Sequence, residues 1–130
     1  MKKILIIEDD PVNQHLLRNM LSQEGYIIES IMDGLDILND LTVLKSDLIL
    51  LDMMIPHLYE SSDLINLYKD INTPTIVMSS IDREDGEYFA KKIGALAFFS
   101  KPVNYLELLI KINSTLSTDS IRDSNSMNCA

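Results

Sequence analysis

Short apolar runs alternate with longer segments of helical periodicity along this chain, and this alternation restricts the fold more than any other feature. The clearest runs cover residues 4–7, 48–51, 75–78 and 96–99. The run at 48–51 is apolar at every position, as expected for a parallel strand that helices cover on both faces. A strand–helix unit repeated in this way predicts an α/β fold, a (βα)5 doubly wound parallel sheet with helices on both faces.

Local signals give the boundaries of the expected elements. Asp10 followed by Pro11 is a helix start, and Gly25 and Gly94 are typical helix ends. Gly86 lies inside a segment of helical pattern and favours fraying there. The sequence predicts strands over residues 2–7, 26–31, 47–51, 75–79 and 96–100. Helices are expected over residues 11–24, 34–44, a segment after Pro56, 83–93 and 103–116.

The apolar stripe of two of these helices can be predicted from spacing. In the first helix the stripe contains Leu16, Leu17, Met20 and Leu21, and in the last helix it contains Leu106, Leu109, Ile110 and Ile112. We expect these residues to pack against the sheet. The polar segment 118–130 is predicted to be a mobile tail that follows a single domain over residues 1–117.

Composition and charge exclude several classes of function. The net charge of −9 opposes direct binding to nucleic acid and suits a protein that gathers carboxylates around a cation. Charges or prolines interrupt every apolar run, and the first run is too short for a secretory signal, so we expect neither a membrane span nor export. The single cysteine, Cys129, cannot form an intramolecular disulfide, and a free thiol is typical of the reducing cytoplasm.

Each clear apolar run leads into a residue suited to phosphate chemistry. The first run is followed by Glu8 and Asp9, the others by Asp52, Ser79 and Lys101. Carboxyl ends of parallel strands meet at one sheet edge, so these side chains are expected to gather there. Mg²⁺ takes oxygen ligands and would relieve the repulsion among the carboxylates. Asp10 is more simply explained as a helix cap.

Asp52 is the candidate for the central chemistry. A carboxylate at the end of a buried strand can attack phosphorus and form an aspartyl phosphate. Lys101 can pair with a phosphoryl oxygen and Ser79 can donate a hydrogen bond to another. Singly, each is more often an ordinary polar residue at a strand end or in a loop. A cis bond between Lys101 and Pro102 would help to aim the lysine inward, although trans is the commoner state.

Four segments in order give the chain a resemblance to the receiver domains of two-component response regulators, the family of the chemotaxis receivers. They are KILIIEDDP at 3–11, DLILLDMMIP at 47–56, PTIVMSS at 74–80 and GALAFFSKP at 94–102. The resemblance covers about residues 2–116. By analogy with that family we expect the flavodoxin-like strand order 2-1-3-4-5.

The resemblance also implies a role for each site residue. Asp52 looks like the phosphoacceptor, and Lys101 matches the family's lysine. Ser79 and Phe98 occupy the hydroxyl and aromatic switch positions. Glu8, Asp9, Asp52 and the backbone carbonyl of Met54 would hold Mg²⁺, with Asp9 the more direct ligand.

The implied function is that of a signalling phosphoacceptor and not of an enzyme with an external substrate. Phosphate would come from phosphohistidine on a histidine kinase or a histidine phosphotransfer protein. A downstream protein would bind the surface of the fourth helix, fifth strand and fifth helix. The chain departs from the family after Pro56, where Leu58, Tyr59 and Glu60 replace a run that usually contains glycine. Apolar Met54 offers no side-chain hydrogen bond to a hydrolytic water.

The sequence leaves several alternatives to a stand-alone phosphorylated receiver. The chain could be a receiver module cut from a larger regulator or hybrid kinase, or an interaction module that never carries phosphate. A phosphatase of the haloacid-dehalogenase type also uses an aspartyl phosphate, but it usually begins its acidic cluster with Asp where this chain has Glu8. Turnover of phosphate esters would distinguish that class.

Overall fold

The computed structural model contains a five-stranded parallel sheet with strand order β2-β1-β3-β4-β5. The structure describes residues 1–31, 45–52, 66, 71–80 and 83–117. The strands are β1 (Lys3–Ile7), β2 (Ile27–Ile31), β3 (Leu48–Asp52), β4 (Thr75–Ser79) and β5 (Ala97–Ser100). The predicted fold class and strand order are confirmed, and every strand boundary agrees with the prediction to within one residue.

Three helices are described, and their ends follow local signals. They are α1 (Pro11–Gln23), α3 (Arg83–Ile93) and α4 (Tyr105–Leu116). The Asp10 side chain accepts a hydrogen bond from the backbone N–H of Val12 at 3.0 Å, which caps α1 as predicted. Gly25 and Gly94 have positive φ angles of 91° and 75° just after α1 and α3, a conformation that costs glycine little.

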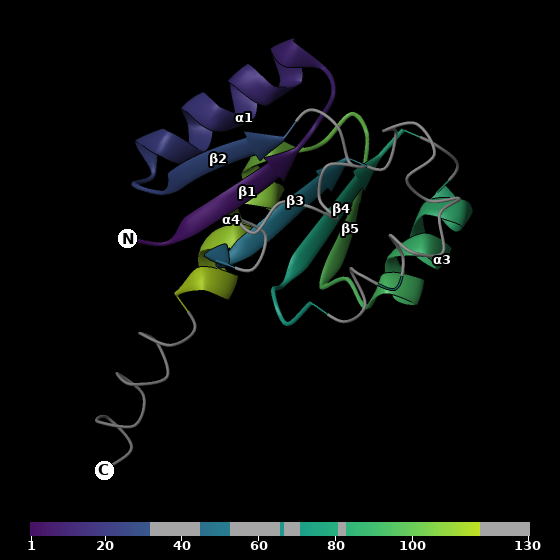
Figure 1. Ribbon diagram of the computed structural model, residues 1–130. Coiled ribbons are helices and arrows are strands. Elements are labelled where there is room, and N and C mark those ends of the chain that lie inside the picture. Colours follow the sequence, from purple (N-terminus) through teal and green to yellow (C-terminus); the bar gives the residue numbers. More distant parts are fainter. Residues whose placement is uncertain (32–44, 53–65, 67–70, 81–82, 118–130) are drawn as a thin grey trace.

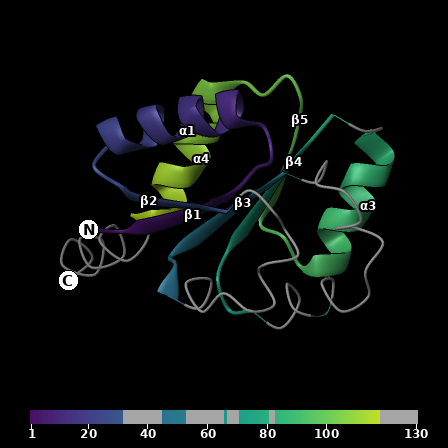
Figure 2. The same ribbon diagram turned by 45° about the horizontal axis from the view of Figure 1, so that its top comes forward.

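The helices cover both faces of the sheet, α1 and α4 one face and α3 the other (Figures 1 and 2). Alternation along each strand divides the core between the two faces. The face toward α1 and α4 buries Ile4, Ile6, Leu17, Leu21, Leu48, Leu50, Ile76, Met78, Leu108, Ile112 and Leu116. The face toward α3 buries Leu5, Ile7, Ile31, Ile49, Leu51, Val77, Phe89, Ala90 and Ile93. Strands β1, β3 and β4 thus supply residues to both layers, which explains their continuous apolar sequence.

The predicted packing faces of two helices need correction. In α1, Leu17 and Leu21 are buried but Leu16 is 50% exposed. In α4, Leu106 and Ile110 are exposed, whereas the buried residues are Leu108, Ile112 and Leu116. Leu108, Ile112 and Leu116 recur every four residues and form the stripe that faces the sheet. The prediction holds for Ile112 and for Leu109, which is partly buried and packs against this layer. It failed at Leu106 and Ile110 because α4 carries apolar residues around much of its circumference, so spacing alone allowed more than one face.

Some predictions lie outside the described residues. These are the helices over 34–44 and after Pro56, and the tail 118–130. Among the described helices, none is long and apolar enough to cross a membrane.

Candidate phosphoacceptor site

The candidate site lies at the carboxyl edge of the sheet, where four strands deliver the predicted side chains. Glu8 follows β1, Asp52 ends β3, Ser79 ends β4 and Lys101 follows β5. The backbone N–H of Lys101 donates to the Ser79 carbonyl at 2.7 Å, which extends the pairing of β4 and β5 to this edge. The Lys101–Pro102 peptide bond is cis.

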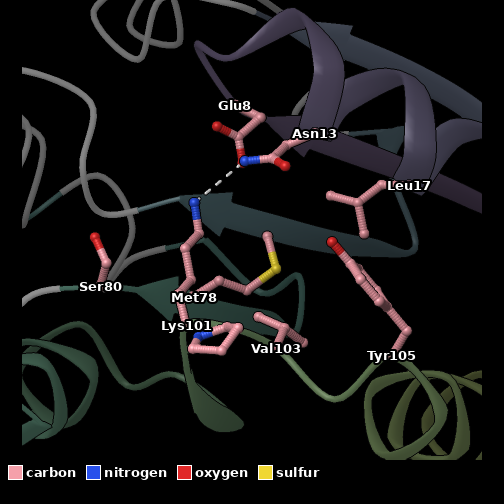
Figure 3. Close-up of a pocket in the computed structure, with 9 residues that line it drawn as sticks. Glu8, Asn13, Leu17, Met78, Ser80, Lys101, Val103 and Tyr105 are labelled. Carbon is pink, nitrogen blue, oxygen red and sulfur yellow. Dashed lines mark hydrogen bonds and ion pairs between the residues drawn. The ribbon is translucent and has the colours of Figure 1, made fainter.

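Lys101 joins the two buried carboxylates. Its Nζ lies 3.0 Å from Asp52 Oδ2 and 3.5 Å from Glu8 Oε2, and Figure 3 shows Lys101 and Glu8 pointing toward one another. Glu8 and Asp52 are each 1% exposed. Charged groups at such burial are costly unless paired, so the ammonium is an essential part of this arrangement.

The electrostatics of the site show a surplus of negative charge. Burial, the hydrogen bond with Asp52 and the charge of Asp52 raise the pKa of Glu8 to about 8. Burial alone would lower the pKa of Lys101, but the hydrogen bond and charge of Asp52, together with Glu8, outweigh it and raise that pKa. The site therefore favours a proton or a cation beside its carboxylates.

Carboxylate oxygens of Glu8, Asp9 and Asp52 lie within 4.8 Å of one another. Asp9 is exposed while the other two are buried, so the cluster opens to solvent on one side. All three donors are hard oxygen atoms, which fits Mg²⁺ and does not favour soft metals. Met54, whose carbonyl is the fourth predicted ligand, lies outside the described residues.

Ser79 and Phe98, the predicted switch residues, lie on neighbouring strands. Ser79 is fully buried at the end of β4, and Phe98 is partly buried on β5. Val77 pairs with Phe98 and Ser79 with Ser100, so Phe98 is a diagonal neighbour of Ser79. Phe98 packs against the core layer beneath α3.

A family model for the response regulator receiver domain matches residues 4–113, most of the chain. The chain belongs to this family. The resemblance drawn from the four sequence segments is therefore confirmed.

Individual relatives of this receiver fall into two groups by length. Protein PilH of Pseudomonas aeruginosa is 31% identical over 119 residues, which cover 89% of this chain and 98% of PilH. Transcriptional activator protein IrlR of Burkholderia pseudomallei is 29% identical over 98% of this chain but only 56% of its own length. The receiver thus spans about half the length of most curated relatives that it matches. Among solved structures, the receiver domain of Francisella response regulator 1452 superposes with a TM-score of 0.76 at 27% identity, covering 92% of this chain and 99% of that one.

A pocket of about 400 Å³ adjoins the carboxylate–lysine cluster of this receiver (Figure 3). Sequence reasoning did not find it, because its walls come from distant parts of the chain. The lining residues are Glu8, Asn13, Leu17, Met78, Ser80, Lys101, Pro102, Val103 and Tyr105. Glu8 and Lys101 thus lie at the polar end of an otherwise largely apolar pocket between α1 and the segment before α4.

Proposed function

We propose that this receiver accepts a phosphoryl group from phosphohistidine onto Asp52 and signals by a conformational change that follows. The observation that carries the proposal is the contact of Lys101 Nζ with Asp52 Oδ2 at 3.0 Å beside a cluster of carboxylates. This combination supplies a nucleophile, a cation for phosphoryl oxygens and ligands for a divalent metal at one strand edge. Membership of the receiver family supports it.

The reaction follows from the groups present. A carboxylate oxygen of Asp52 attacks phosphorus, a P–O bond forms, the P–N bond to the donor imidazole breaks, and the imidazole leaves with the electron pair. The Lys101 ammonium, which pairs with the Asp52 carboxylate before the reaction, then pairs with an oxygen of the transferred phosphoryl group. The Ser79 hydroxyl donates a hydrogen bond to another phosphoryl oxygen. In this proposal the chain has no substrate other than the phosphodonor. It catalyses only the transfer of phosphate to its own Asp52 and the slow hydrolysis of the resulting aspartyl phosphate.

Glu8, Asp9 and Asp52 would hold Mg²⁺, with the carbonyl of Met54 as a further ligand. When bound, Mg²⁺ screens the charge between the carboxylate and the incoming phosphoryl oxygens. Asp9 is the exposed member of the cluster and the most direct candidate ligand. Glu8, whose pKa is about 8, would lose its proton as the cation enters.

Output would come through protein contact. The partner that supplies phosphate is a histidine kinase or a phosphotransfer protein, and a downstream protein would bind the surface of α3, β5 and α4. Phe98 belongs to β5, is a diagonal neighbour of Ser79 in the sheet and packs beneath α3, so it would report the state of the site to this surface. The near-complete coverage of PilH supports action as a single-domain regulator. The half-length coverage of IrlR favours the other arrangement, a receiver module within a larger regulator.

Intact-mass spectrometry after incubation with acetyl phosphate tests the proposal. We expect one phosphoryl adduct on the wild type that requires Mg²⁺. The matched variant Asp52→Asn keeps the size and hydrogen-bonding capacity of the side chain but lacks the nucleophilic carboxylate, so it should remain unmodified.

Other outcomes of the same experiment separate the alternatives. An adduct on Asp52→Asn would place the acceptor elsewhere. No adduct on the wild type with any donor would favour a phosphate-independent interaction module. In a separate assay, multiple turnover of a phosphate ester would instead indicate a phosphatase.

A further inference from the structure

Gly86 of α3 forms a notch that receives the ring of Phe98. A Cβ atom added to Gly86 would lie 2.5 Å from Phe98 Cε2 and closer still to Cζ. Carbon atoms in contact are normally about 3.5–4 Å apart, so no other residue fits at position 86 with the ring in this place. The backbone of α3 therefore contacts the aromatic ring directly.

The position of this glycine within a helix is unusual. Glycine in a helix interior is less favourable than alanine, and Gly86 is buried in the fourth position of α3. It is needed neither for a turn nor for a helix end, and the helix is continuous from Arg83 to Ile93. The fraying that the sequence suggests at Gly86 is not seen. The close approach of the ring gives a physical reason for glycine at this position.

The ring also links α3 to the candidate phosphoacceptor site. Phe98 is the diagonal neighbour of Ser79 across the pairing of β4 and β5. Helix α3 begins four residues after Ser79 in the chain. The Phe98 ring thus lies between β5, which pairs with the strand that carries Ser79, and α3, which follows Ser79 in the chain. A groove of about 200 Å³ beside the ring, lined by Glu87, Ala90, Lys91 and residues 95–97, gives a displaced ring a place to go.

We propose that Gly86 is a positioning residue for the phosphoacceptor site: by admitting the Phe98 ring it braces α3 against β5 and fixes the place of the Ser79 hydroxyl. The inference rests on the proposed function of Asp52 and extends it. A methyl group at position 86 would expel the ring into the groove. The loss of the brace would leave Ser79 less well placed for a phosphoryl oxygen, and binding of a phosphoryl group would weaken.

The contact itself can be measured without any ligand. The chain has three phenylalanines, Phe89, Phe98 and Phe99, so ring-labelled phenylalanine gives a simple NMR spectrum. We expect a nuclear Overhauser effect between the Gly86 α-protons and the Phe98 ring, and a large shift of the Phe98 ring signals in Gly86→Ala. The exposed Asp85→Ala, one residue earlier in α3, is the matched control and should leave these signals in place. Absence of the Gly86–Phe98 effect in the wild type would overturn the proposal.

The link to the site is tested by the affinity for beryllofluoride, a phosphoryl mimic, in the presence of Mg²⁺ and well below the melting temperature. Under these conditions a change in fold stability alone does not alter affinity. We expect Gly86→Ala to weaken binding by about threefold or more, and Asp85→Ala to leave it unchanged. In a Phe98→Ala background, where the brace is already lost, Gly86→Ala should have no further effect. Unchanged or tighter binding by Gly86→Ala, or equal effects in both backgrounds, would contradict the proposal.

Failure of the proposed function gives a different result. In that case the wild type itself would not bind beryllofluoride, or Asp52→Asn would bind it equally well. The proposed role of Gly86 would be wrong, while the proposed function stands, if the wild type binds beryllofluoride, Asp52→Asn does not, and Gly86→Ala binds it as tightly as the wild type.

Discussion

The charges of three residues, Glu8, Asp52 and Lys101, do not balance, and this imbalance determines what the site can bind. One ammonium contacts two carboxylates that are each 1% exposed. Lys101 compensates one carboxylate, and the raised pKa of Glu8 shows that the other is held more easily as the acid than as the anion. A divalent cation would replace this proton and allow both carboxylates to ionise.

The raised pKa of Glu8 predicts a pH dependence of stability in metal-free solution. Because the folded state holds this proton more tightly than the unfolded state, the stabilisation is complete below about pH 4.5 and is lost as pH rises to about 8. Glu8→Gln mimics the protonated acid but cannot ionise, so its stability should not fall over this pH range. Relative to the wild type, the free energy of unfolding of the variant should rise by on the order of 5 kcal/mol across this pH range, about 1.4 kcal/mol for each unit of the pKa shift.

Urea unfolding at a series of pH values, with a chelator present, measures this difference. The exposed Glu84→Gln serves as a control for removal of a carboxylate and should follow the wild-type profile. Parallel profiles for Glu8→Gln and the wild type would show that Glu8 ionises normally in the folded protein.

At the scale of helices and strands, elements with strong local signals were predicted well. The cap formed by Asp10 and the glycine at position 25 delimit α1 because each acts within one turn of the helix end. The continuous apolar run of β3 identified a strand buried on both faces. The acidic cluster, Asp52 and Lys101 could be predicted together because parallel strands bring their carboxyl ends to one edge.

The features that the sequence did not reveal depend on contacts between distant elements. The notch at Gly86 exists because a ring from β5 reaches the backbone of α3, and neither segment contains a sign of the other. The pKa of Glu8 depends on the burial and charge that β3 and the segment after β5 bring to it. The packing face of α4 was wrong at Leu106 and Ile110 because a helix rich in apolar residues does not define one stripe.

Two isoleucines of α4 test its corrected packing face. Ile112 is fully buried and Ile110 is 59% exposed, although the two lie only two positions apart. Ile112→Ala should lower the free energy of unfolding by about 2–4 kcal/mol, because it leaves a cavity between α4 and the sheet. Ile110→Ala, the matched control, should change it by about 0.5 kcal/mol or less. Urea unfolding gives both values, and similar losses for the two variants would mean that α4 packs in another orientation.

At the scale of the whole molecule, the site joins the strands that carry the core. Glu8, Asp52, Ser79 and Lys101 follow or end four different strands, and β1, β3 and β4 are buried on both sides. A ligand that holds these strand ends together cannot bind to a chain in which the strands have separated. Binding should therefore stabilise the sheet as a unit rather than one loop.

Hydrogen exchange tests this global linkage. Because β1, β3 and β4 form the buried centre of the sheet, we expect amides in their centres to exchange through global unfolding. Each should then slow by the same factor when Mg²⁺ and beryllofluoride bind. At a ligand concentration about 100 times its dissociation constant, linkage predicts a stabilisation of about 2.7 kcal/mol, or about 100-fold slower exchange. Asp52→Asn should show no such effect at the same concentrations. Slower exchange confined to β3 would mean that the ligand contacts Asp52 without engaging β1 and β4. Exchange that slows by the same factor in all three strands requires a site built from the ends of all three.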